Sequence, residues 1–239
     1  MSKKTHLRII NDIVDFQENR PDGIYFHVNK DNFYKNYALI IGPKNTPYFG
    51  GYFFFEINFP KNYPKSPPQA KMLTIGANVR FNPNLYENGK VCLSILGTWQ
   101  GPKWKPIMNL RLVLLSIQSL MGHHPIHNEP GYEKVKPNDI RSVNYNKFII
   151  YNTYKLAIIN VIDGKYKKVS KFFKKEINEN MKENMKALYE DLLSYKIIYG
   201  IETIKKHLYF LPSRTLLNFE KLEETFNIKM KKFDIKNET

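Results

Sequence analysis

The stretch NPNLYENGKVCLSIL, residues 82–96, contains the only cysteine of a 239-residue chain. Pro83 fixes its own φ, and the Asn88–Gly89 pair is typical of a tight turn. Apolar residues resume at Val91, so the pattern predicts an ordered loop that ends directly before Cys92. Spacing alone leaves two interpretations of this cysteine open. It is either a partly exposed reactive thiol or a small hydrophobic residue of the core.

Further blocks of sequence stand on both sides of this loop in a fixed order. They are GPKNTPYFGG at 42–51, FPKNYPKSPP at 59–68, WKP at 104–106 and VLLSI at 113–117. Together with Asn82–Asn84, and with Cys92 eight positions after Asn84, these blocks resemble the signatures of ubiquitin-conjugating enzymes, the E2 family. The resemblance covers roughly the first two thirds of the chain.

Three features point to one subgroup of the E2 family. Segment 98–104 is longer than the minimal E2 loop, Asn82 stands where most E2s have histidine, and NEPGYE follows the central helix at 128–133. In these respects the chain is similar to the E2 domain of large E2/E3 hybrid enzymes and of the giant inhibitor-of-apoptosis-type E2.

Hydrophobic periodicity predicts the elements of the first part of the chain. An amphipathic helix is expected over 5–17, with strands over 24–28, 33–41, 52–59 and 69–75. Strand 52–59 alternates and is expected to be half-buried, whereas helix 110–121 is apolar on nearly all sides and is expected to be buried under the sheet. The resemblance implies an α+β fold, the ubiquitin-conjugating (UBC) fold, with an N-terminal helix, a four-stranded antiparallel meander, and central and C-terminal helices.

The composition changes after Asp163–Gly164, so we expect two domains. Residues 1–162 form the catalytic domain, and 163–239 form a basic, mainly helical C-terminal extension in which Ser213 is an N-cap candidate for a short helix. The lysines of the extension suit nucleic acid or an acidic membrane. The interpretation we favour is that its apolar stripe packs into the core and its lysines are solvated.

Composition sets the remaining expectations. A net charge of +15 favours acidic partners, and a single cysteine excludes an internal disulfide. The N-terminus lacks the apolar core of a signal peptide, and no run approaches the length of a transmembrane helix, which predicts a cytoplasmic or nuclear protein. His123, His124 and His127 are interpreted as loop histidines, not as a metal site.

The resemblance implies an enzyme that accepts ubiquitin from an activating enzyme (E1) as a thioester on Cys92. It then passes ubiquitin to a lysine of a protein substrate or to a ligase (E3). No metal or organic cofactor is implied, because ATP is used by E1 only. Asn84 is implied as the stabiliser of the tetrahedral oxyanion or as a loop-structuring residue, and Glu129 as the carboxylate that orients or deprotonates the incoming lysine.

The resemblance also implies partner surfaces. Pro64, Lys65, Pro106 and Ile107 lie in the loops that receive E1 and E3. Lys65 replaces an aromatic ligase anchor, which predicts a different chemistry of binding to RING-type ligases. Leu115 is the position that contacts the carried ubiquitin, although ordinary core packing is the interpretation we favour for it.

Three other functions are left open. The cargo is another ubiquitin-like modifier, the chain is an inactive E2-like interaction scaffold, or it is a nucleic-acid-binding protein. The presence of both Cys92 and Asn84 argues against the scaffold, and the sequence contains no recognisable nucleic-acid-binding motif.

Overall fold

A computed structural model of the chain describes residues 3–205, 208–212 and 214–238. The chain divides into two compact units, one made of Met1–Ile41 and Phe53–Met121 and the other of Gly42–Tyr52 and Gly122–Thr239. Each unit therefore draws on two separate segments of the sequence. The predicted domains, 1–162 and 163–239, divide the chain differently from these two units. That residues 1–162 form the catalytic domain stays a prediction.

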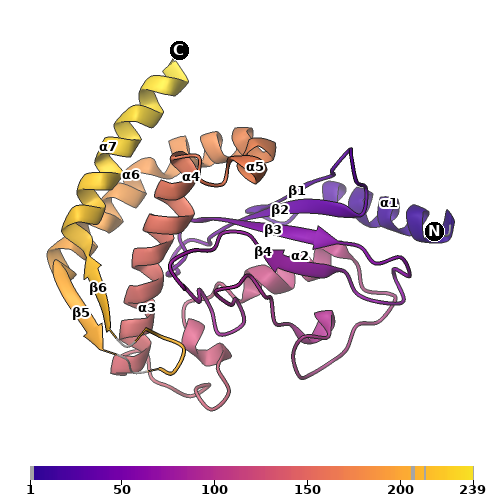
Figure 1. Ribbon diagram of the computed structural model, residues 1–239, viewed down its shortest axis with the longest axis horizontal. Helices are drawn as coiled ribbons and strands as arrows, with labels where there is room; N and C mark the ends of the chain where they lie inside the picture. Colours follow the sequence, from indigo (N-terminus) through magenta and orange to yellow (C-terminus); the bar gives the residue numbers. More distant parts are fainter. Residues whose placement is uncertain (1–2, 206–207, 213, 239) are drawn as a thin grey trace. The chain divides into compact units, whose positions relative to one another are not determined.

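The first unit is built around the predicted four-stranded meander. Its strands, which lie in the order β1-β2-β3-β4, are β1 (Ile24–His27), β2 (Lys35–Ile41), β3 (Tyr52–Asn58) and β4 (Gln69–Met72). Antiparallel pairing sets Ile24 opposite Ile40 and Phe55 opposite Met72. The fold is therefore the α+β fold that the resemblance implied, and Figure 1 shows the strands in chain order.

Strand β3 is buried more completely than its alternation predicts. All four residues from Tyr52 to Phe55 are buried, and only Glu56 and Asn58 are partly exposed. Tyr52, the first residue of β3, belongs to the second unit, and there its buried hydroxyl lies 3.3 Å from the carbonyl oxygen of Ile177 and 3.2 Å from Asn180 Oδ1. The prediction of a half-buried strand is therefore wrong for the first half of β3.

Two helices complete the first unit. They are α1 (Lys3–Glu18) and α2 (Leu110–Ser119), which contact each other. Asn109 caps α2, because its side-chain oxygen accepts a hydrogen bond from Leu112 N at 3.0 Å. Leu112 and Leu115 lie on an exposed face of α2. The expected burial of this helix, which is apolar on nearly all sides, therefore holds for the face that carries Leu110, Val113, Leu114 and Ile117 but not for the face that carries Leu112 and Leu115.

The second unit is mainly helical. Its helical segments are η2 (Pro125–Asn128), α3 (Ile140–Asn152), the π-helical turn η3 (Thr153–Ile159), α4 (Asn160–Ile162), α5 (Lys167–Ser170), η4 (Lys171–Phe173), α6 (Lys174–Tyr199) and α7 (Phe219–Glu238). The run from α3 to α4 ends at Ile162, as predicted. The expected burial of the apolar stripe is confirmed for Val169, Ile177, Met181 and Leu188, whereas Phe172 and Met185 of the same stripe are partly exposed.

A β-hairpin in the extension was not predicted. Strands β5 (Ile201–Lys205) and β6 (Arg214–Asn218) pair antiparallel, with Ile201 opposite Asn218. Residues 214–218 are thus a strand where a short helix was expected, and α7 begins directly after it. The proposed N-cap, Ser213, lies outside the described residues.

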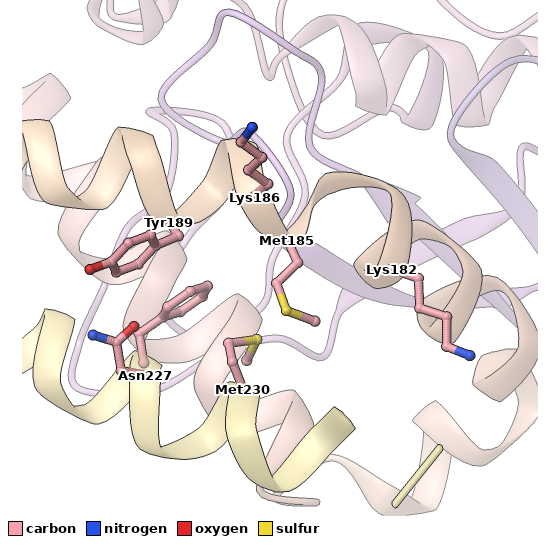
Figure 2. Close-up of a pocket in the computed structure, with 7 residues that line it drawn as sticks. Lys182, Met185, Lys186, Tyr189, Asn227 and Met230 are labelled. Carbon is pink, nitrogen blue, oxygen red and sulfur yellow. The ribbon is translucent and has the colours of Figure 1, made fainter. Parts of the chain in front are cut away.

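Helices α6 and α7 pack against each other and leave a groove of about 450 Å³ between them (Figure 2). It is lined by Lys182, Met185, Lys186, Tyr189, Phe226, Asn227 and Met230. Among the described helices, none is both long and apolar enough to cross a bilayer.

Candidate active site

The loop before Cys92 is held by its own asparagines. The side-chain oxygen of Asn82 accepts a hydrogen bond from Asn84 N at 2.8 Å, and the side-chain nitrogen of Asn82 donates to the carbonyl oxygen of Leu120 at 2.8 Å. Because Leu120 is the C-cap of α2, Asn82 joins the loop to the end of that helix. Asn82 is fully buried, so both bonds are shielded from water.

Asn84 and Cys92 are brought together by two hydrogen bonds. Cys92 N donates to the carbonyl oxygen of Asn84 at 2.9 Å, and Asn84 Nδ2 donates to the carbonyl oxygen of Cys92 at 2.7 Å. Asn84 Oδ1 is buried and has no hydrogen-bond partner within the described residues. The side-chain amide of Asn84 therefore holds the backbone of Cys92. One N–H of Nδ2 makes this bond, and the second N–H is not used by it.

Cys92 itself is only 1% exposed. The expectation of a partly exposed thiol is not met in this conformation. The residue lies between the loop and the short helix η1 (Ser94–Leu96), and η1 ends at Gly97 with a left-handed φ of 71°. Reaction at this sulfur therefore requires local movement around the thiol, because nucleophilic attack needs direct access to the sulfur atom.

Thr98 clamps the backbone on both sides of Cys92, and sequence reasoning missed it. Its hydroxyl donates to the carbonyl oxygen of Val91 at 2.8 Å and accepts from Leu93 N at 3.0 Å. The signal available in the sequence was only its place at the start of the long 98–104 segment. Thr98, the first residue of that segment, thus fixes the backbone on both sides of the cysteine.

Arg80 was also missed. It is buried, its Nε donates to the carbonyl oxygen of Pro83 at 3.1 Å, and its guanidinium lies 3.8 Å from the ring centroid of Tyr86. An arginine rarely occurs in a protein interior without partners for its charge, and no local pattern in the sequence indicates where those partners are.

Gly89 allows the loop to approach β4. Its φ is +87°, and a Cβ at this position would lie 2.4 Å from the carbonyl oxygen of Met72. Gly89 in turn accepts a hydrogen bond from Met72 N at 2.8 Å. The turn predicted from Asn88–Gly89 is therefore confirmed, with a physical requirement for glycine.

We predict that Gly89→Ala lowers the free energy of unfolding by about 2–3 kcal/mol, because it adds a clash with backbone to an unfavourable φ. The matched control is Gly97→Ala, where φ is +71° and nothing lies within 4 Å of the added Cβ. Thermal denaturation of both variants gives the comparison. Equal losses of melting temperature in the two variants would show that the close approach of Gly89 to β4 does not require glycine.

The two loops that the resemblance assigns to E1 and E3, residues 60–68 and 104–109, are called the partner loops here, and both are fixed to α1. Arg8 donates to the carbonyl oxygens of Pro106 at 2.7 Å and Met108 at 2.6 Å, and it forms an ion pair with Asp12 at 2.7 Å. Asp12 also accepts a hydrogen bond from the hydroxyl of Tyr63. Burial, together with this bond to a carboxylate, raises the pKa of Tyr63 far above its usual value.

A second bond joins the two partner loops directly, since Trp104 Nε1 donates to the carbonyl oxygen of Pro64 at 2.7 Å. Lys65 and Pro106 are exposed on these loops, and Ile107 is 87% exposed. Ile107 is therefore accessible to a binding partner.

Glu129 belongs to the second unit. It follows η2, its side chain is only 7% exposed, and its Oε1 accepts a hydrogen bond from the hydroxyl of Tyr209 at 2.8 Å. Oε2 is buried, with no partner among the residues that the structure describes. Glu129 is therefore not an ordinary surface carboxylate, and its catalytic role stays a prediction.

Comparison with known proteins decides the family. A family model described as ubiquitin-conjugating enzyme matches residues 8–148, which is more than half of the chain. The chain belongs to the ubiquitin-conjugating enzyme family. The matched E2 residues include the Asn82–Cys92 loop, both partner loops and Glu129.

Relatives agree with this E2 assignment. Over 69% of this chain and 50% of the relative, the sequence is 48% identical to "Ubiquitin-conjugating enzyme E2 Z" of Danio rerio. It is 35% identical over 77% of the chain to a "Probable ubiquitin-conjugating enzyme" of Acanthamoeba polyphaga mimivirus, of which it covers 15%. The chain spans about half the length of the E2 Z relative.

The expected similarity to E2/E3 hybrid enzymes is confirmed. The chain is 47% identical over 52% of its length to "Dual E2 ubiquitin-conjugating enzyme/E3 ubiquitin-protein ligase BIRC6" of Homo sapiens, and covers 3% of that protein. The subgroup was thus recognisable from Asn82, the long 98–104 segment and the NEPGYE motif.

The remaining predicted residues of this E2 are placed as follows. Leu115 is 38% exposed, so the core-packing interpretation we favoured is wrong and the ubiquitin-contact role stays a prediction. His127 Nε2 lies 2.8 Å from the carbonyl oxygen of Val135, while His123 is exposed. Within the described residues, no group of three potential ligands is arranged to hold a metal ion.

Proposed function

We propose that this E2 family member accepts ubiquitin from E1 as a thioester on Cys92 and transfers it to a lysine of a protein substrate or to an E3 ligase. The observation that carries the proposal is the Asn84–Cys92 pair, in which the amide donates to the carbonyl oxygen of the cysteine on an ordered loop. No other cysteine of the chain competes for this role.

The proposed chemistry consists of two acyl transfers. In the first, the Cys92 thiolate attacks the carbonyl carbon of the E1 thioester, a new C–S bond forms, and the thiolate of E1 leaves. In the second, the amine of a lysine attacks the carbonyl carbon of the Cys92 thioester, a C–N bond forms, the C–S bond breaks with Cys92 leaving as a thiolate, and the proton lost by the amine passes to Glu129 or to solvent. Neither step uses a metal or organic cofactor of this chain, and ATP is consumed by E1.

Three groups share the second transfer in this proposal. The free N–H of Asn84 stabilises the oxyanion that develops at the thioester carbonyl, Glu129 orients or deprotonates the lysine, and Leu115 contacts the carried ubiquitin. A strong general base beside Cys92 would also activate water, and a carrier has to keep its thioester intact until the acceptor arrives.

A charging assay tests the proposal. The purified full chain is incubated with E1, ATP and ubiquitin and then run on a gel with and without reductant. We expect a band shifted by one ubiquitin that disappears with reductant. If the band shifted only with a different ubiquitin-like modifier, that modifier would be the cargo. If it shifted with no modifier, the chain would be an interaction scaffold instead of an enzyme.

We further predict that Ile107→Asp slows charging by E1 by about tenfold or more, because it places a charge in an apolar contact. The matched control is Ile197→Asp, which changes an isoleucine that is 76% exposed in α6. Initial charging rates at low E2 concentration measure both effects. Equal rates for the two variants would show that the 104–109 loop is not a partner surface.

A further inference from the structure

The inference concerns Tyr209, a residue of the extension, and it rests on the proposed role of Glu129 in the second transfer. The backbone of Glu129 is fixed on both sides, since its N–H donates to the carbonyl oxygen of Ile126 and its carbonyl oxygen accepts from Tyr132 N, both at 3.0 Å. Its side chain has one hydrogen-bond donor among the described residues, the hydroxyl of Tyr209.

The two oxygens of the Glu129 carboxylate differ. Oε1 is engaged by Tyr209, whereas Oε2 is buried and without a hydrogen-bond partner in the described part of the chain. Burying a carboxylate oxygen without a hydrogen-bond donor costs free energy, because the charged oxygen loses its contacts with water. The presence of such an oxygen in the folded protein therefore needs an explanation. An incoming amine or ammonium group is a donor that would satisfy Oε2 once local movement exposes this oxygen, as is also required at Cys92.

The segment that carries Tyr209 is anchored by its neighbours. Leu208 and Leu211 are buried, and Phe210 contacts the ring of Tyr145 in α3 at a centroid distance of 5.2 Å. Tyr209 itself is 62% exposed. Packing therefore holds the segment through the flanking residues, while Tyr209 adds little buried area and its hydroxyl makes a defined bond to a carboxylate 80 positions away in the sequence.

From this geometry we infer that Tyr209 is a positioning residue for lysine transfer. Its hydroxyl holds Glu129 through Oε1 and so leaves Oε2 as the acceptor for the lysine amine. The C-terminal extension, in this view, supplies part of the apparatus for the second transfer and is more than an appendage. Tyr209 does not touch the reacting atoms, and its effect passes entirely through Glu129.

The test uses the full chain charged with ubiquitin and then discharged in single turnover to free lysine or to a small thiol. We expect Tyr209→Phe to charge normally and to discharge to lysine about tenfold more slowly, as for the loss of one hydrogen bond to a charged group. The loss should appear in the rate at saturating lysine and in the apparent KM for lysine. Discharge to the thiol, which brings no ammonium group, should be unchanged.

A double-mutant cycle separates positioning from general damage to the structure. In a Glu129→Gln background, Tyr209→Phe should cause no further loss, because the group through which it acts has already been altered. The matched control is Tyr189→Phe, which removes a hydroxyl from a tyrosine of α6 that is also part of the second unit and not fully buried. It should leave every rate unchanged.

Four results would overturn the inference. These are wild-type lysine discharge in Tyr209→Phe, equal slowing with lysine and thiol, an undiminished effect in the Glu129→Gln background, or wild-type discharge in Glu129→Gln alone. All four can be observed only if the wild-type chain forms the thioester. Failure of the proposed function would instead appear at the earlier step, as the absence of any charged wild-type protein.

Discussion

Replacing Cys92 with serine is expected to abolish the reducible ubiquitin adduct completely. Cys92 is the only cysteine in the chain, so no second thiol can take over the acyl group. A serine hydroxyl is a weaker nucleophile than a thiolate, and any adduct that it forms is an oxygen ester, which reductant does not cleave. Gel analysis with and without reductant shows which bond is present.

The companion variant is Cys92→Ala, which should form neither adduct. Because Cys92 is buried, melting temperatures of both variants should be measured beside the wild type, to separate loss of chemistry from loss of folding. If folded Cys92→Ser still gave a reducible adduct, the position of the thioester would have to be reassigned.

Replacing Asn84 with alanine is expected to leave charging near normal and to slow discharge to lysine by about 10²–10³, the usual effect of losing one oxyanion donor. The loop should survive this change, because Asn84 N and the carbonyl oxygen of Asn84 keep their bonds to Asn82 and Cys92. Only the side-chain bond from Asn84 Nδ2 to the carbonyl oxygen of Cys92 is removed.

A matched control lies four residues away in the same loop. The side-chain oxygen of Asn88 accepts a hydrogen bond from Lys90 N at 3.0 Å, so Asn88→Ala also removes a turn-stabilising amide, but at an exposed site. Single-turnover charging and discharge rates should be measured for both variants. Equal losses in both half-reactions of Asn84→Ala would mean that the amide serves only the shape of the loop.

The sequence predicted the elements whose signals are local. The four strands follow from alternation and turn residues, and the Asn88–Gly89 turn follows from the chemistry of these two residues. The burial of Tyr52 could not be predicted in this way, because its partners Ile177 and Asn180 are more than a hundred residues away in the sequence.

The same distinction applies to the candidate site. Cys92 and Asn84 could be predicted because they stand eight residues apart in a recognisable block of sequence. Thr98, Arg80 and Tyr209 could not, because their importance depends on which backbone or carboxylate oxygen each one reaches after folding. The hairpin β5–β6 was missed because the sequence after Ser213 was interpreted as the start of a short helix, where the structure has strand β6.

The division of the chain has a consequence for how the protein is made. Residues 42–52 leave the ribosome before the residues after 122 that complete the unit to which they belong. Gly50 shows the dependence most directly, because a Cβ added there would lie 2.5 Å from the side chain of Leu188.

At the usual rate of translation of about 5–20 residues per second, roughly 7–30 s separate the synthesis of Gly50 from that of Leu188. During this interval Tyr48 and Tyr52, which are both fully buried in the finished protein, have no completed unit to enter. We therefore expect the nascent chain to present an aromatic segment to chaperones until the residues around Leu188 have been synthesised.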